Sequence, residues 1–231
     1  MNKNPDKKKA IVLFSGGLDS TTLLVYVLDQ GYNVCPLTFL YGQKHSVEVE
    51  RSKNILKKYD LLPSQITFNI DLSFFKNCSL INTLLEVPTS NKNEIPSTYV
   101  PSRNLIFLSI ASGLAETINA EKIFIGVNSV DYSGYPDCRR EFIDSFNKTL
   151  NAGTKQGLKN KLHVEAPFTE MSKKEIIELG VTLNVDYSMT HSCYNPSKEG
   201  SACGNCDSCR LRLTGFKQAN LKDPLDYISN L

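Results

Sequence analysis

Residues 10–28 read AIVLFSGGLDSTTLLVYVL, an apolar run that stops at two glycines and resumes as a second apolar run. The first run has the composition of a buried strand, and the second run, from Thr21 on, that of a helix. A strand that breaks at Gly16 and Gly17 and restarts as a helix points several backbone N–H groups into one concave turn. Because the helix N-terminus adds partial positive charge there, the stretch predicts a phosphate site.

Hydroxyl groups surround this turn, on Ser15, Ser20, Thr21 and Thr22. The loop lacks the Lys-Ser/Thr ending of a Walker A sequence, so we do not expect γ-phosphoryl transfer of the P-loop type. A carboxylate beside phosphates repels them unless a cation lies between, so Asp19 predicts Mg²⁺ between its carboxylate and a pyrophosphate. The simpler alternative is a polar turn that binds no ligand.

The same loop resembles the pyrophosphate-loop signature of the ATP-pyrophosphatases. The resemblance implies an enzyme that splits ATP between its α- and β-phosphates and leaves AMP on a substrate oxygen. It implies an ATP-binding segment made of Phe14, Ser15, Gly16, Gly17, Leu18, Asp19, Ser20, Thr21, Thr22, Leu23 and Leu24. Because known members act on carboxylates, amides or nucleobase carbonyls, this motif alone does not select the substrate.

Composition describes an ordinary globular protein of 231 residues, with 41% hydrophobic and 22% charged residues. This length suits one substantial core and a small appended module. The net charge of +2 indicates no broad nucleic-acid or membrane surface. The apolar runs are too short for a membrane span or a signal peptide. We expect a cytoplasmic protein with neither nucleic acid nor membrane as partner, and a homodimer is an open possibility.

Strand-like and helix-like segments alternate along the chain. Strands are expected at 9–14, 33–40, 66–70, 122–127 and 163–166. Helices are expected at 20–30, 46–59, 103–119, 139–150 and 173–179, the last capped by Ser172 and ended by Gly180. The alternation predicts an α/β fold with a doubly wound parallel sheet, which the resemblance makes Rossmann-like, of the adenine nucleotide alpha hydrolase type.

Ligands of such sheets bind at the carboxyl ends of the strands. We therefore expect the phosphate loop, the loop at 128–137 and the Ser172 cap to meet at one crevice. Residues 72–100 lose their periodicity, and an irregular segment of that length indicates a functional loop or insertion.

Four of the seven cysteines follow a metal-binding spacing, Cys193-x9-Cys203-x2-Cys206-x2-Cys209. Four thiolates close a tetrahedron around Zn²⁺ and leave no open position, so we expect one structural zinc per chain. The alternatives are an iron–sulfur cluster, unpaired core cysteines, and His191 as a ligand in place of Cys193. We accordingly divide the chain into an α/β domain at 1–187 and a metal-binding module at 188–231.

Residues 128–139 read NSVDYSGYPDCR, a loop shaped by glycine and proline that carries aromatic rings, carboxylates and an arginine. Such a loop can stack a flat heterocycle and bind its edge. A carboxylate suits the adjacent N–H donors of a guanine-type ring, and an arginine suits a substrate carboxylate. The candidate residues are Asp131, Tyr132, Tyr135, Asp137 and Arg139. The alternative is a structured turn with a solvated face.

Several segments together resemble the family of 7-cyano-7-deazaguanine synthases of the queuosine precursor pathway. They are the phosphate loop, LYGQKH at 40–45, VPSRN at 100–104, DYSGYPDCR at 131–139, SCY at 192–194 and CGNCDSC at 203–209. These matches run from Phe14 to Arg212 and so cover nearly the whole chain. The sequence departs at Ser102, where the family usually carries glycine, which puts the local backbone conformation in question.

This resemblance implies an ATP-dependent ligase that converts 7-carboxy-7-deazaguanine and ammonia to the nitrile. Oxide and hydroxide are poor leaving groups, so we expect each carboxyl oxygen to leave on AMP, first from an adenylated acid and then from an adenylated amide. It implies catalytic roles for Asp19, Lys173 and Arg103, and substrate contacts by Arg103 and Asn104. The alternatives are a surface lysine at position 173 and a helix-capping ion pair at Arg103.

Residues after the second strand, Tyr41, Gln43 and His45, could line the adenosine side. Other classes fit less well. An RNA-modifying pyrophosphatase should bring a basic surface, and a glutamine-dependent synthetase needs a glutaminase domain for which the chain has no room. A zinc-ribbon module without enzymatic activity would not need the phosphate loop. Nitrogen is therefore expected from free ammonia or from a partner.

Overall fold

A five-stranded parallel sheet forms the centre of the molecule, with the strand order β3-β2-β1-β4-β5. The computed structural model describes residues 7–42, 47–82, 84–86, 95–128, 135–159, 161–197 and 200–228. The strands are β1 Lys9–Leu13, β2 Asn33–Leu40, β3 Ile66–Asn69, β4 Lys122–Phe124 and β5 His163–Glu165. The helices are α1 Leu18–Asp29, α2 Val47–Lys58, α3 Arg103–Ile118, α4 Arg140–Gly153, α5 Lys173–Thr182 and α6 Asp207–Gln218. The predicted doubly wound α/β fold is confirmed.

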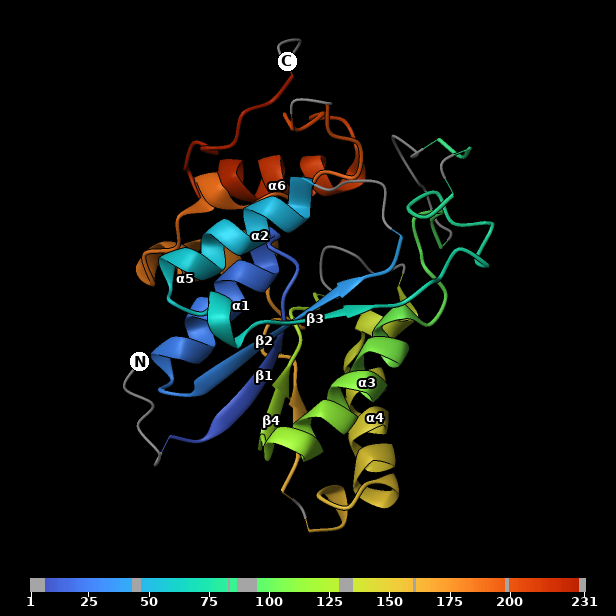
Figure 1. Cartoon of the computed structure of the whole chain (residues 1–231). Coiled ribbons are helices and arrows are strands. Elements are labelled where there is room, and N and C mark those ends of the chain that lie inside the picture. The colour runs from blue at the N-terminus through green and yellow to red at the C-terminus, as the bar shows by residue number, and fades with distance from the viewer. Residues whose placement is uncertain are drawn as a thin grey trace.

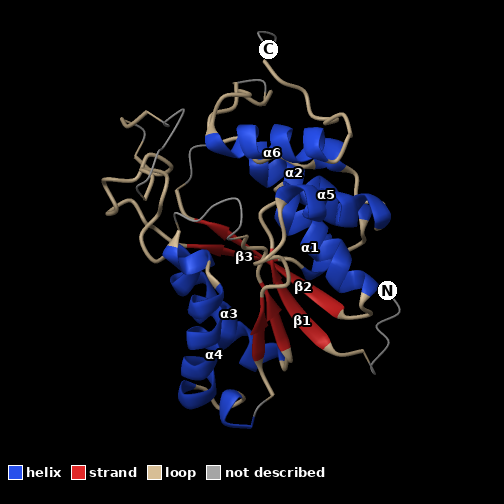
Figure 2. Ribbon diagram, turned by 180° about the vertical axis from the view of Figure 1, so that it is seen from behind, coloured by secondary structure: helices blue, strands red, loops and turns tan. Residues whose placement is uncertain are grey.

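Two buried cores lie on opposite faces of the sheet because successive residues of a strand point to opposite sides. Ala10 and Val12 belong to a cluster with residues of α1, α2 and α5, whereas Ile11 and Leu13 belong to a cluster with residues of α3 and α4. Figure 1 and Figure 2 show the two groups of helices on either side of the strands. The change in winding direction falls between β1 and β4, where doubly wound sheets bind their ligands.

Helix α5 does not end at Gly180 as predicted but continues to Thr182. An ideal Cβ at Gly180 would lie 1.8 Å from the hydroxyl oxygen of Tyr187. The glycine is therefore required by the close passage of Tyr187 over the helix and is not a C-cap. The predicted capping box is present, since the Ser172 hydroxyl accepts from the Glu175 N–H while the Glu175 carboxylate accepts from the Ser172 N–H.

Helix α6 was not predicted, and it packs on α5 near the C-terminus (Figure 1). Its buried residues are Cys209, Arg212, Gly215 and Phe216. They follow helical spacing, but only one of them is a large apolar residue. The hydrophobic periodicity that reveals a helix in a sequence is consequently missing here.

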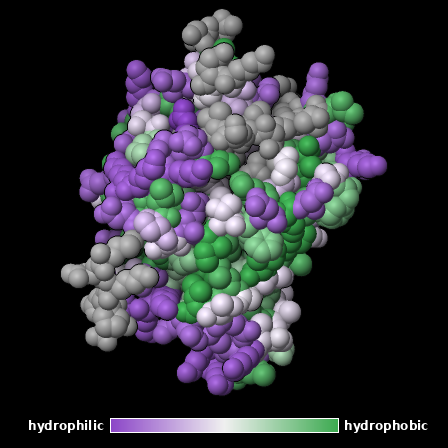
Figure 3. All heavy atoms as spheres, in the orientation of Figure 1, coloured by the Kyte–Doolittle hydropathy of each residue, from purple (hydrophilic) through white to green (hydrophobic). Residues whose placement is uncertain are grey.

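The described parts of the irregular segment at 72–100 form a small satellite core of Leu72, Cys78, Leu80, Ile81 and Val100. Near it, hydrophobic residues gather on the surface over β3 and α3 (Figure 3). Phe68 is 40% exposed there and Leu105 is 46% exposed. Among the described residues, no helix combines the length and the apolar character that a membrane crossing requires.

Candidate active site

A cavity of about 340 Å³ lies at the carboxyl ends of β1, β2 and β4. Its walls include Phe14 and Ser15 after β1, Tyr41 after β2, and the backbone from 125 to 128 after β4. Lys173, next to the Ser172 cap, lines it too. The phosphate loop, the start of the 128–137 loop and the α5 N-terminus therefore meet in one crevice, as the strand alternation predicted.

The phosphate loop is a tight turn held by its own hydroxyl groups. Gly16 has φ +84°, and an ideal Cβ there would lie 2.9 Å from the Cβ of Ser52, so both conformation and space require glycine. The Ser15 hydroxyl accepts from the Gly17 N–H at 3.3 Å and lies 3.1 Å from the Ser20 hydroxyl. Gly17 is the N-cap of α1 and supplies no side-chain cap, so the N–H groups of the first helical turn need acceptors from outside the helix.

The second half of the predicted ATP segment faces the protein interior. Thr21, Thr22, Leu23 and Leu24 are each at most 1% exposed and do not line the cavity. The Thr22 hydroxyl donates to the Leu18 carbonyl and lies 2.9 Å from the Tyr187 hydroxyl. The prediction that both threonines present hydroxyls to phosphate is therefore corrected, because α1 turns them into the core.

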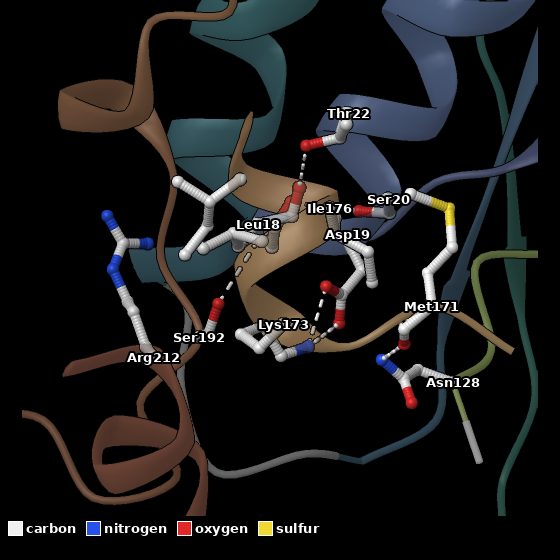
Figure 4. Close-up of polar contacts among 12 residues, drawn as sticks. Leu18, Asp19, Ser20, Thr22, Asn128, Met171, Lys173, Ile176, Ser192 and Arg212 are labelled. Atoms are coloured by element: carbon white, nitrogen blue, oxygen red, sulfur yellow. Dashed lines mark hydrogen bonds and ion pairs between the residues drawn. The ribbon is translucent and has the colours of Figure 1, made fainter. Parts of the chain in front are cut away.

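Asp19 and Lys173 form an ion pair inside the cavity. The Lys173 Nζ lies 2.7 Å from each carboxylate oxygen of Asp19, and its side chain is 12% exposed (Figure 4). The alternative of a surface lysine is wrong. A carboxylate and an ammonium at the mouth of a phosphate loop can hold a magnesium ion and a phosphate oxygen respectively.

The end of the cavity beside the start of α3 is aromatic around one arginine. The Arg103 Nη1 donates to the Tyr41 hydroxyl at 3.2 Å. Phe107, one turn further along α3, stacks on Phe39 with ring centroids 3.9 Å apart. Leu80, from the irregular segment, completes this wall. Among the described residues Arg103 bonds a phenol and no carboxylate, so the helix-capping ion pair considered for it is not found.

Asp137 lies under the N-terminus of α3 and does not line the cavity. Its Oδ2 accepts from the Asn104 N–H at 3.0 Å, and the Asn104 amide donates back to the Asp137 carbonyl at 3.1 Å. The residue as a whole is 7% exposed. Asp137 thus holds the helix end that carries Arg103, whereas Asn104 itself lines the cavity.

Of the other candidates in the 128–139 loop, one lines the cavity, one lies outside its lining, and two lie outside the described residues. Tyr135 lines the cavity and shares a 2.7 Å hydrogen bond with Thr98. Arg139 is exposed and lies outside the lining. Asp131 and Tyr132 lie outside the described residues, as do Gln43 and His45 near Tyr41.

Burial sets the protonation of two groups near the site. Burial, with the nearby Asp137, raises the pKa of the Cys138 thiol to about 12. Burial also raises the pKa of Tyr187 to about 12. Cys138 lines the cavity but stays protonated at neutral pH, which makes it a poor nucleophile.

The four C-terminal cysteines converge on one point. Their Sγ atoms all lie within 4.8 Å of one another, and those of Cys203 and Cys209 are 3.9 Å apart. A tetrahedral ion with bonds of about 2.3 Å to sulfur separates its thiolates by about 3.8 Å. Backbone N–H groups point at these sulfurs, for example from Cys203 to Cys193 at 3.2 Å. The cluster therefore fits a single metal ion.

Hydrogen bonds among the thiols affect the cysteines of this cluster in opposite directions. They lower the pKa of Cys206 and raise the pKa of Cys193 and of Cys209. His191 lies outside the group of four and lines the large cavity instead. The alternative of His191 as a ligand in place of Cys193 is wrong.

Residues of the C-terminal module that sequence reasoning missed also line the cavity, namely Ser192, Tyr194, Ser208, Leu211 and Arg212. Arg212 is 2% exposed and makes two hydrogen bonds to Asp223, at 2.7 and 2.9 Å. The SCY segment at 192–194 was among the motifs that carry the family resemblance, and this was the available signal for Ser192 and Tyr194. Nothing in the sequence marked Arg212.

A glycine turn after the first strand of a Rossmann-like parallel sheet, with an acidic and a basic residue beside it, is typical of nucleotide-binding α/β proteins. The family model described as "Queuosine biosynthesis protein QueC" matches residues 9–220, and the chain belongs to this family. The resemblance drawn from the motifs is thereby confirmed.

Two 7-cyano-7-deazaguanine synthases agree with this assignment. A 7-cyano-7-deazaguanine synthase of Desulfatibacillum aliphaticivorans is 48% identical over 229 residues, which cover 96% of this chain and 97% of the relative. The synthase of Saccharophagus degradans is 48% identical over 221 residues, 95% of this chain and 98% of the relative. A solved 4-thiouridine synthetase in complex with RNA and ATP aligns with a TM-score of 0.48 and 18% identity, over 92% of this chain and 53% of that one.

Proposed function

We propose that this protein is an ATP-dependent 7-cyano-7-deazaguanine synthase that acts on 7-carboxy-7-deazaguanine and ammonia. The family and the names of its relatives support the proposal. The observation that carries it is one cavity with a phosphate loop and the Asp19–Lys173 pair at one end and Arg103 among aromatic rings at the other. A nucleotide and a flat acid can meet between these two ends.

The phosphate end suits the triphosphate of ATP. The N–H groups at the start of α1 and the hydroxyls of Ser15 and Ser20 surround the turn. We assign Mg²⁺ to Asp19, where the ion would neutralise the departing pyrophosphate, and a phosphate oxygen to Lys173. Because the two side chains already lie together, both charges are preorganised for the reaction.

The aromatic end suits the acid. The Arg103 guanidinium has the planar donor geometry that binds a carboxylate through two hydrogen bonds. Phe107, Tyr41 and Tyr135 offer flat surfaces for a deazaguanine ring. Asn104 offers an amide at the same wall, and we keep Asp131 and Tyr132 as candidate partners of the ring N–H groups. Asp137 is assigned to support of the α3 N-terminus, and Arg139 is given no substrate contact because it is exposed outside the cavity.

The proposed reaction uses two adenylations. A carboxylate oxygen attacks the α-phosphorus and pyrophosphate leaves. Ammonia then attacks the acyl carbon, loses a proton, and releases AMP to give the amide. The amide oxygen attacks the α-phosphorus of a second ATP and pyrophosphate leaves. Loss of AMP and of both amide protons then forms the nitrile. The site must hold the acceptor oxygen in line with the α-phosphorus, which is a task of positioning.

The metal assigned to the four cysteines is Zn²⁺ in a structural role. Four thiolates leave no open position for a substrate. An iron–sulfur cluster divides its thiolates among two or four irons, and thiolates on different irons need wider spacing than these sulfurs have. Cysteines that bind metal as thiolates persist in a reducing compartment, so we place the protein in the cytoplasm.

The test is product analysis with the purified protein. MgATP, ammonium and 7-carboxy-7-deazaguanine should give AMP, pyrophosphate and the nitrile. The matched control is 7-deazaguanine, which lacks the carboxyl group and should release no AMP. Equal AMP release with both compounds, or ADP in place of AMP, would contradict the proposal.

A further inference from the structure

The C-terminal metal module reaches into the ATP site at two points. We infer that Ser192 and Gly215 are positioning residues through which the metal module sets the phosphate loop and Lys173. The inference rests on the proposed function, which makes these two elements the ATP site. The C-terminal metal module, residues 188–231, would then take part in catalysis. Metal binding alone does not require such a part.

Ser192 holds the phosphate loop from a distance of 174 residues in sequence. Its Oγ accepts from the Leu18 N–H at 3.2 Å (Figure 4). Leu18 is the first residue of α1, so no carbonyl of the helix can accept from its N–H. The neighbouring His191 N–H donates to the Gly16 carbonyl at 3.1 Å. The segment before Cys193 therefore holds both sides of the glycine turn.

The Ser192 hydroxyl is also suited to a bound phosphate. A hydroxyl that accepts one hydrogen bond can still donate its own hydrogen. Ser192 lines the same cavity as Ser15 and Lys173. Its hydroxyl can thus fix the loop and donate to a phosphate oxygen at the same time.

The second contact lies between Gly215 of α6 and the aliphatic part of the Lys173 side chain. An ideal Cβ at Gly215 would lie 2.5 Å from the Lys173 Cγ, 3.0 Å from its Cβ, and 2.9 Å from the Ile177 Cδ1. Atoms so near the backbone of α5 have little room to move away. Any side chain at position 215 would therefore displace the lysine from Asp19 or push α6 outward.

The metal ligands lie close to both contacts in sequence. Cys193 follows Ser192 directly, and α6 begins after Cys206 and carries Cys209 before it reaches Gly215. A metal ion that joins these cysteines fixes the start of α6 relative to Ser192. Metal and nucleotide should therefore bind with positive coupling, since each favours the same arrangement.

The experiment measures binding of α,β-methylene-ATP with Mg²⁺ by calorimetry, together with zinc content and AMP release, on the zinc-loaded full chain. We expect Ser192→Ala to weaken nucleotide binding about five- to tenfold, in line with one lost hydrogen bond near charge, and to keep its zinc. Ser192→Thr should restore most of the affinity. Gly215→Ala should lower kcat for AMP release at least tenfold, with a smaller change in KM for ATP.

Gly113→Ala is the matched control, because an ideal Cβ at this helical glycine meets nothing within 4 Å. It should behave as the unmodified protein. Wild-type nucleotide affinity in Ser192→Ala, or loss of zinc as the cause of its weaker binding, would overturn the inference. So would normal turnover in a folded Gly215→Ala; if that variant does not fold, Ser192→Ala decides alone. The binding measurements need no acid substrate, so they remain decisive even if the proposed nitrile is not formed.

Discussion

The Nζ of Lys173 lies 2.7 Å from both carboxylate oxygens of Asp19, although 154 positions separate the two residues in sequence. This ion pair joins the first turn of α5 to the first turn of α1. ATP with its magnesium ion offers each group a new partner, a cation for Asp19 and a phosphate oxygen for Lys173. We expect this exchange of partners to be the central electrostatic event of nucleotide binding.

Asp19→Asn should keep the fold and lose Mg²⁺-dependent AMP formation. The amide oxygen still hydrogen-bonds Lys173, but it lacks the charge that holds the cation. We expect AMP release to fall by about 10²–10³-fold, the usual effect of removing one preorganised electrostatic group. Turnover is measured with circular dichroism as the check on folding. Near-normal AMP release by the folded variant would refute the role of Asp19.

Purified protein should contain one zinc ion per chain, measured by elemental analysis. Cys206→Ser should lower Tm and the zinc content together, because the serine hydroxyl is a poor zinc ligand at this site. Cys35→Ser, at a half-buried thiol outside the cluster, is the control and should keep its zinc. Iron in place of zinc, or soluble active protein without metal, would contradict the assignment.

Arg103→Ala should raise KM for 7-carboxy-7-deazaguanine strongly and leave the affinity for ATP nearly unchanged. The guanidinium lies at the aromatic end of the cavity, where it bonds Tyr41 and not the Asp19–Lys173 pair. Arg103→Lys should recover only part of the loss because an ammonium cannot make the planar two-bond contact. Loss of ATP affinity with a normal KM for the acid would place Arg103 on the nucleotide instead.

Asp137→Ala should act on the same substrate indirectly. It leaves the buried Asn104 N–H without its acceptor, which destabilises the protein by about 1–3 kcal/mol and frees the start of α3. We expect a lower urea midpoint and a raised KM for the acid. Asp137→Asn keeps a carbonyl oxygen and should stay close to wild type. Equal loss of acid binding in both variants would indicate that the carboxylate itself contacts the ring.

Ser102→Gly should stabilise the protein by about 1 kcal/mol, because Ser102 adopts φ +55° and the left-handed region favours glycine. This backbone conformation explains why the family usually carries glycine at the position. The measurement is urea unfolding, with Ser109→Gly as the control within the same helix, which should be destabilised. A loss of stability in Ser102→Gly would show that the serine side chain stabilises the fold by more than its left-handed backbone conformation destabilises it.

Arg212→Met should destabilise the fold by about 3–5 kcal/mol, since it leaves the buried Asp223 carboxylate without its cation. The pair connects α6 to the C-terminal segment, and both side chains are less than 5% exposed. Lys122→Met, which breaks the half-exposed pair with Glu165, should cost about 1 kcal/mol or less. Similar losses of stability in the two variants would contradict the expectation that the buried ion pair contributes more than the half-exposed one.

The fold and the two ends of the site were predictable because they depend on local signals. Glycines after an apolar strand marked the phosphate loop, and paired cysteines marked the metal cluster. What could not be predicted depends on tertiary packing. Gly180 resembles a helix end until Tyr187 is seen to pass over it. Thr22 resembles a phosphate donor until its hydroxyl is found in the core.

Ser192 and Arg212 were also missed in the site because their positions depend on tertiary packing. A serine beside a metal ligand carries no sequence signal that it caps a helix at the other end of the chain. A buried arginine interrupts the apolar pattern by which α6 would have been recognised. Asp137 was predicted as a substrate contact because its residue type suits a guanine-like ring, yet its position beneath α3 gives it a supporting role.

The most direct test of the proposed reaction follows the carboxyl oxygens. 7-Carboxy-7-deazaguanine labelled with ¹⁸O at both carboxyl positions is incubated with the protein, MgATP and ammonium, and the products are analysed by mass spectrometry. If each oxygen leaves on an adenylate, two AMP molecules should form per nitrile, each with one ¹⁸O, and pyrophosphate should carry none. Label in inorganic phosphate alongside ADP, or nitrile formed with unlabelled AMP, would contradict the double adenylation.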